Sequence, residues 1–125
     1  MDVTPIIPAD RKVIDSYGPG LFRVSGTVYR QAVIVFPGDV MEWAAPAAFA
    51  QLGADHFGPV LDRKDEVEVL LLGSGQHMQL FPRALRQTLR DGGIVVDVMD
   101  TGAACRTYNV LLSEGRKVAA ALFPA

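Results

Sequence analysis

Apolar and polar positions change their rhythm about halfway along the chain. In the first half, short runs of β-branched and aromatic residues are separated by turns rich in Gly and Pro, which is the pattern of β-strands. The dipeptide Ser25-Gly26 between two such runs predicts a tight hairpin. A short helix is expected near residues 54–61. Strands are predicted over residues 13–17, 21–24, 27–30, 32–36 and 39–43.

In the second half, apolar runs alternate with stretches of helical spacing. The runs over residues 67–72, 94–99 and 117–123 predict three more strands. Between the first two, Pro82 suits the first position of a helix, and Gly92-Gly93 suits its end.

A second helix is predicted to be capped by Thr101 and closed by Gly115. Within it, Ala104, Tyr108 and Leu111 recur at spacings of four and three, so they predict its buried stripe. Strand, helix, strand, helix and strand therefore follow one another, which favours parallel pairing through helical crossovers. We expect one α/β domain over residues 1–125, with a central mixed sheet, helices packed on it, and the early hairpin as an added β layer.

Composition and charge limit the classes of function. Half of the 125 residues are hydrophobic and 21% are charged, as in a globular domain with its own core. The net charge of −2 argues against a nucleic-acid partner, because affinity for phosphates needs clustered Lys and Arg. Arg83, Arg86 and Arg90 form a local basic excess, which is interpreted as a solvated helix face.

Cysteine and histidine are too few for the common metal and disulfide frameworks. The single Cys105 excludes an intrachain disulfide, and His56 and His77 lack the spacing of a metal site, so no metal is predicted. Residues 1–8 lack the basic and long apolar regions of a signal peptide, and no apolar run is long enough to span a membrane. The sequence predicts a soluble cytoplasmic protein without a transmembrane segment.

Two loops follow the predicted carboxyl ends of strands, where α/β sheets usually bind ligands. If these strands are neighbours, the loops share one rim, and the helix after Thr101 directs its free N–H groups toward it, which favours an anion. Arg106 and Asn109 fall on one polar stripe of that helix. A small ligand-binding site is therefore one hypothesis, and its residues are Gly73, Ser74, Gly75, Thr101, Arg106 and Asn109.

The alternative is structural, with Arg106 bonding carbonyl groups of the glycine loop beside a solvated helix face. Motifs for chemistry are incomplete. Met78 stands where the dinucleotide fingerprint needs its third glycine, and Ser74 lacks a recruited histidine. Cys105 is expected to be a packed thiol, and Trp43 either a core residue or an anchor for an interface. No catalytic residues and no cofactor are predicted.

Short motifs spread along the chain carry a family resemblance. They are Ser16-Tyr17-Gly18 with Phe22, Leu72-Gly73-Ser74-Gly75, Pro82, Gly93-Ile94, Met99-Asp100-Thr101, and Ala103-Ala104-Cys105-Arg106-Thr107-Tyr108-Asn109-Val110-Leu111 with Glu114-Gly115-Arg116. From about residue 12 onward, the chain resembles the domain-of-unknown-function family that includes the third mitochondrial complex I assembly factor, and its short bacterial branch in particular.

This resemblance implies a three-layer β+α/β/α fold with a central mixed sheet, and it supplies no catalytic residue or cofactor. It also implies a role through protein contacts, since the mitochondrial relative acts in assembly of the NADH:ubiquinone oxidoreductase. A non-enzymatic protein-binding or assembly module is therefore the first functional hypothesis, and the small-ligand site or an enzyme is the second. Self-association as a homo-oligomer, through the early hairpin or Trp43, is the third.

Overall fold

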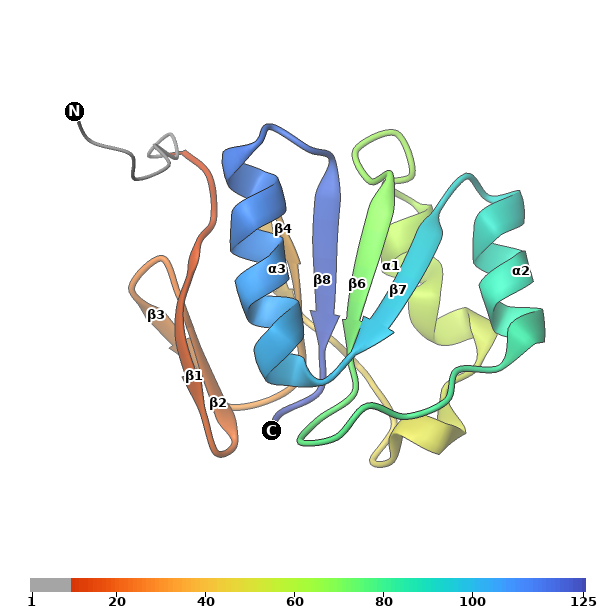
Figure 1. Ribbon diagram of the computed structural model, residues 1–125, viewed down its shortest axis with the longest axis horizontal. Coiled ribbons are helices and arrows are strands. Elements are labelled where there is room, and N and C mark those ends of the chain that lie inside the picture. Colours follow the sequence, from red (N-terminus) through yellow and green to blue (C-terminus); the bar gives the residue numbers. More distant parts are fainter. Residues whose placement is uncertain (1–9) are drawn as a thin grey trace.

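The computed structural model describes residues 10–125 and contains two β-sheets with a helix packed between them (Figure 1). One sheet has three antiparallel strands, and the other has five strands of mixed direction. The segment 1–8, on which the argument against a signal peptide depends, lies outside the described residues.

The small sheet is the predicted hairpin layer. Its β2–β3 turn has positive φ at both Ser25 (44°) and Gly26 (85°), as a tight two-residue hairpin requires. Phe22 and Val24 direct buried side chains toward the central layers, so the small sheet shares a core with the rest of the chain. The strands are β1 (Ile14–Gly18), β2 (Leu21–Val24) and β3 (Thr27–Tyr29).

The central sheet has the strand order β5-β4-β8-β6-β7. All five residues of β8 are buried because this last strand lies in the middle of the sheet. It pairs antiparallel with β4 and parallel with β6, and β6 pairs parallel with β7, so the predicted mixed sheet is confirmed. The strands are β4 (Val33–Phe36), β5 (Asp39–Glu42), β6 (Val69–Gly73), β7 (Val95–Met99) and β8 (Val118–Leu122).

Helices cover both faces of this sheet. The long helix α3 (Thr101–Ser113) lies between the two sheets, and α2 (Arg83–Asp91) and α1 (Gly58–Leu61) pack on the opposite face (Figure 1). Two 3-10 turns, Phe49–Gln51 and Ala54–Phe57, precede α1. The arrangement confirms the α/β fold class, with α3 and the small sheet on one side of the central mixed sheet and the other helices behind it.

Two helix starts differ from the sequence prediction. Pro82 is the N-cap of α2 and not its first residue. Thr101 is not the cap of α3: Asp100 is, because its carboxylate oxygen accepts a hydrogen bond of 2.9 Å from the amide of Ala103. An aspartate at this position also places negative charge at the positive end of the helix dipole.

The face behind the sheet is sealed by an aromatic cluster. Trp43 is buried, its indole N–H donates to the carbonyl of His56 (2.8 Å), and its ring meets Phe57 and Phe123. Trp43 is therefore a core residue, and it is not available as the anchor of an interface.

Candidate functional site

The two predicted loops meet at the carboxyl ends of β6 and β7, because Gly73 pairs in register with Met99. The amide of Ser74 donates to the carbonyl of Met99 (2.9 Å), and the amide of Thr101 donates to the carbonyl of Gly75 (2.8 Å). We name Gly73, Ser74, Gly75 and Thr101 the glycine rim. The sequence-predicted neighbourhood of these four residues is therefore present in the fold.

Thr101 joins three separate segments at the glycine rim. Its buried hydroxyl accepts a hydrogen bond from the amide of Gly75 (2.8 Å) and donates one to the carbonyl of Phe123 (2.7 Å). The start of α3, the loop after β6 and the end of β8 are held together by this one side chain. Because both bonds are internal, the hydroxyl has no proton left for a ligand.

Packing explains the glycine at position 73. A Cβ atom there would lie 2.9 Å from both the Oγ1 of Thr101 and a methyl carbon of Leu122, and 3.1 Å from the Cα of Thr101. Gly75 has a φ of +99°, which side chains rarely adopt. The close approach of strand and helix accounts for Gly73, and the backbone conformation of the loop accounts for Gly75.

Ser74 is also used inside the fold. Its buried hydroxyl lies 2.7 Å from the carbonyl oxygen of His77, to which it donates, and 3.2 Å from that of Met99. The side chain of Gln79 donates to the carbonyl of Ser74 (2.9 Å), which orders the loop further. The proton of the Ser74 hydroxyl is therefore used in a hydrogen bond that stabilises the loop.

Asn109 lies away from the glycine rim, on the flank of α3 that faces β1. Its amide oxygen accepts from the backbone N–H of Ile14 (3.0 Å) and its amide nitrogen donates to the carbonyl of the same residue (2.8 Å). This pair of bonds replaces a strand partner for β1 and attaches the small sheet to α3.

Arg106 points to the small sheet, not to the glycine loop. Its Nη1 donates to the hydroxyl oxygen of Tyr17 (2.6 Å), so the alternative in which Arg106 bonds carbonyls of the glycine loop is wrong. The guanidinium is exposed, and the Tyr17 ring packs against Gly102 in the first turn of α3. Arg106 is therefore the one predicted site residue that still offers N–H donors to solvent beside this helix start.

Two ionisable groups, Cys105 and Tyr108, are buried on the inner side of α3. Burial raises the pKa of the Cys105 thiol to about 12, although the charge of Arg106 lowers it in part. Burial likewise raises the pKa of Tyr108, whose hydroxyl donates to the carbonyl of Lys12 (2.9 Å). The packed thiol predicted for Cys105 is confirmed by its position in the core.

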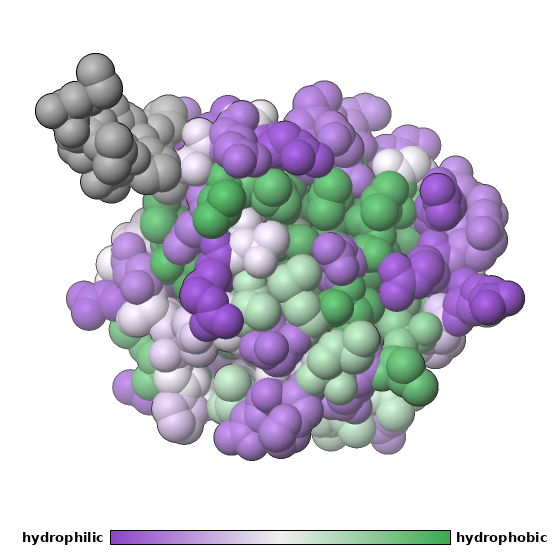
Figure 2. Space-filling model, viewed as in Figure 1, coloured by the Kyte–Doolittle hydropathy of each residue, from purple (hydrophilic) through white to green (hydrophobic). Residues whose placement is uncertain are grey.

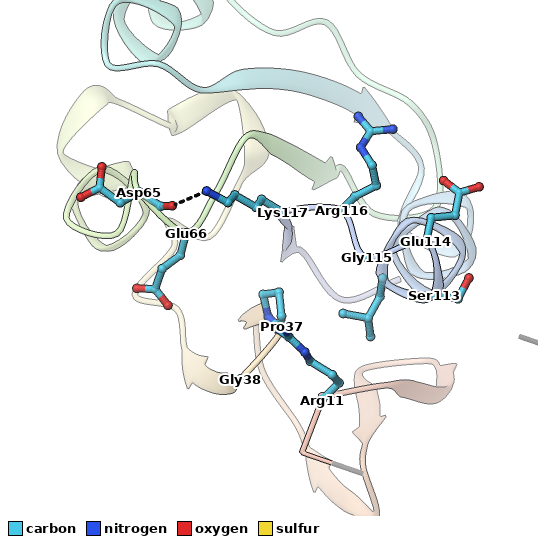
Figure 3. A pocket seen from close by; sticks show the side chains of 11 residues that line it. Arg11, Pro37, Gly38, Asp65, Glu66, Ser113, Glu114, Gly115, Arg116 and Lys117 are labelled. Atoms are coloured by element: carbon cyan, nitrogen blue, oxygen red, sulfur yellow. Dashed lines mark hydrogen bonds between the residues drawn. The ribbon is translucent and has the colours of Figure 1, made fainter. Parts of the chain in front are cut away.

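A polar hollow of about 730 Å³ opens at the opposite end of the sheet (Figure 3). The Nζ of Lys117 donates to the carbonyl of Asp65 across it (3.2 Å), and the neighbouring Arg116 lies 3.5 Å from Glu68. Sequence reasoning missed this hollow because it is formed by turns far apart in the chain, with no shared motif. Its charged lining residues are Arg11, Asp65, Glu66, Glu114, Arg116 and Lys117.

Within residues 10–125, every helix is too short or too polar to cross a bilayer. In the same range, no three His, Cys, Asp or Glu side chains come together as ligands for a metal ion.

A sequence profile described as "Protein of unknown function (DUF498/DUF598)" matches residues 14–123. The chain belongs to this family. An uncharacterised protein of Rhodobacter capsulatus is 38% identical over 111 residues, which are 89% of this chain and 83% of that protein. The relatives of this chain also include mitochondrial assembly factors.

Proteins named NADH dehydrogenase (ubiquinone) 1 alpha subcomplex assembly factor 3 are 32% identical in Danio rerio over 112 residues and 30% identical in Homo sapiens over 116 residues. These matches cover 90% and 93% of this chain but only 64% and 62% of the relatives, so the chain spans less than two thirds of their length.

Solved structures of related proteins have the same fold. One, described as an outer membrane protein from Bartonella henselae, is 38% identical with a TM-score of 0.83, and the match covers 95% of this chain and 98% of that one. Another, from Bordetella pertussis, is described as a Mth938-like domain; it is 26% identical with a TM-score of 0.83, and the match covers 99% and 92% of the two chains.

Proposed function

We propose that this protein is a non-enzymatic protein-binding module that acts in the cytoplasm during biogenesis of respiratory complex I. The observation that carries the proposal is the 30% identity to the human assembly factor across 93% of this chain. That similarity spans almost the whole fold of this chain, which supports a shared mode of action.

The internal use of the polar groups at the glycine rim supports binding over catalysis. The hydroxyls of Ser74 and Thr101 are hydrogen-bonded within the fold, and the nearby thiol of Cys105 is buried with a raised pKa. A catalytic nucleophile needs a free proton path to a base, which these groups lack.

Co-purification from the native host tests the proposal. The protein carries an N-terminal affinity tag at its chromosomal locus, so that its level is native, and the untagged strain is the control. We expect complex I subunits to be enriched over the control in the tagged sample. Recovery of the tagged protein alone, with or without mild cross-linking, would contradict the proposal.

A second candidate is a small anion site centred on Arg106. The supporting observation is its exposed guanidinium, which donates to Tyr17 and retains further N–H groups beside the start of α3. In this proposal Arg106 supplies the charge. Gly73, Ser74, Gly75 and Thr101 fix the start of α3, and Asn109 attaches to that helix the small sheet that carries Tyr17.

A thermal-shift series with phosphate, nucleotides and small carboxylates tests the second candidate. A ligand that raises the Tm of the wild type should lose its effect in Arg106→Ala and keep it in Arg23→Ala, which removes an exposed arginine from β2. An equal rise in Arg106→Ala and the wild type would exclude this site.

A further inference from the structure

One face of the central sheet is only partly covered. The helix α3 packs mainly on β6 and β8 and covers little of the edge strand β7 (Figure 1). Val95 and Asp97 pair in register with Val69 and Leu71, whose side chains belong to the α3 side of the sheet. Side chains of alternate strand residues share a face, so Val95, Asp97 and Met99 also point to that side.

This uncovered area is apolar. Val95 on β7 is 53% exposed and Val110 on the outer surface of α3 is 55% exposed. Figure 2 shows hydrophobic residues in a band across this face, over the C-terminal part of α3 and the beginnings of β6 and β7. We name this surface the β7 face; its half-buried members are Val69, Met99, Ala103, Thr107 and Leu111.

The spacing of the β7 face fits a helix. The helix α3 lies over β6 and β8 about equally, and strands lie about 4.8 Å apart, so β7 is about 7 Å to the side of the α3 axis. Packed helices have axes about 8–10 Å apart, so a helix over the outer side of β7 would contact both the sheet and the flank of α3. The small sheet already occupies the opposite flank of α3, where Asn109 is bonded to β1.

Addition of a strand to the edge fits less well. The Nη1 of Arg86 donates to the carbonyl oxygen of Val96 (2.6 Å). The backbone groups of Val95 and Asp97 point toward β6, so the backbone groups of Val96, between them, point away from the sheet. An arginine therefore occupies part of the edge that an added strand would need. The face of β7, rather than its edge, is open to a partner.

Asp97 determines which charge a partner bound at the β7 face should carry. Its side chain is exposed among the apolar side chains of the β7 face, and within residues 10–125 its carboxylate takes part in no hydrogen bond or ion pair. In a symmetric contact between two copies, the Asp97 carboxylates would come close together and repel. A partner that brings a positive charge to this position would instead gain an ion pair in a partly desolvated setting.

We propose that the β7 face docks an amphipathic helix of a partner protein, whose apolar side carries a Lys or Arg opposite Asp97. The inference rests on the proposed function, because it names the surface and the chemistry through which the module binds its partner. The family relationship alone indicates neither the binding surface nor the charge that the partner should carry.

Two synthetic amphipathic helical peptides serve as probes. They share one Leu-rich apolar stripe and differ in a single central residue of that stripe, Lys in one peptide and Glu in the other. In NMR titrations of the 15N-labelled protein, the Lys peptide should shift amides of β7 and α3 and bind about ten-fold more tightly than the Glu peptide. Asp97→Lys should reverse the preference. The matched control Glu42→Lys, exposed on the opposite edge strand β5, should keep it.

Equal affinity of both peptides, shifts at another surface, or a concentration-dependent dimer formed through the β7 face would each overturn the proposal. The titration uses no complex I subunit, so its result is separable from the proposed function. If wild type and Asp97→Lys co-purify the same complex I subunits, the function stands and the surface is wrong. If the titration succeeds and no complex I subunit is recovered, the surface stands and the function is wrong.

Discussion

The hydroxyl of Thr101 is predicted to be the main polar contribution to the stability of the glycine rim. Thr101→Val keeps the shape and the β-branch of the side chain but removes its oxygen. The amide of Gly75 and the carbonyl of Phe123 then lose their partners at 2.8 and 2.7 Å. Each buried, unpaired group costs about 1–3 kcal/mol, which gives about 2–6 kcal/mol in total.

The added methyl group offsets part of this loss. Burial of one more apolar carbon contributes about 0.8 kcal/mol, so the free energy of unfolding should fall by about 1–5 kcal/mol. Thr107→Val is the matched control, because Thr107 lies on the same helix, is half-buried, and has a hydroxyl that makes no hydrogen bond within residues 10–125. Its effect should stay within about 0.5 kcal/mol.

Urea unfolding of the wild type, Thr101→Val and Thr107→Val measures the differences in the free energy of unfolding. Native-state hydrogen exchange then shows which backbone amides lose protection. The m-values should agree, so that a change in midpoint is a change in stability. The amide of Gly75 should exchange faster in Thr101→Val than in the control. If both variants lose the same stability, or if Gly75 keeps its protection, the hydroxyl does not join the three segments as described.

Three further predictions concern neighbouring parts of the fold. Gly73→Ala should lower the free energy of unfolding by about 1–3 kcal/mol, because its Cβ would lie 2.9 Å from packed atoms, whereas Gly18→Ala has open space and should be nearly neutral by urea unfolding. Asn109→Ala should cost about 1–3 kcal/mol and speed amide exchange at Ile14, and unchanged exchange would contradict the bond. The free energy of unfolding should fall as the pH rises from 9.0 toward about 12, because Cys105 ionises first in the unfolded chain; this slope should be smaller in Cys105→Ser.

Local signals in the sequence were sufficient for most of the elements. Ser25-Gly26 tolerates the positive φ angles of a tight hairpin, and Gly93 and Gly115 have φ of +88° and +76° just after their helices. The parallel order of the last three strands follows from their spacing, since helical crossovers connect them. Each of these features depends on residues close together in the chain.

Contacts between distant segments explain what the sequence could not predict. The polar stripe of Arg106 and Asn109 suggested a solvated helix face, but Tyr17 and the backbone of Ile14 occupy it, from 89 and 95 residues away. Helical spacing identifies the residues that share a face and cannot identify the element that covers it. Asp100 and Thr101 are both residue types that cap helices well. Asp100 is the cap in the structure, because the Thr101 hydroxyl is buried and donates instead to the carbonyl of Phe123.

The amount of assembled complex I in a deletion strain tests the central functional claim most directly. Membranes of the native host with and without this gene are compared by native gel electrophoresis and by NADH:ubiquinone oxidoreductase activity, with the wild-type gene restored as the control. We predict a loss of the fully assembled complex and a gain of smaller intermediates, both reversed by the restored gene. A normal amount of active complex I in the deletion strain would contradict a role in its assembly.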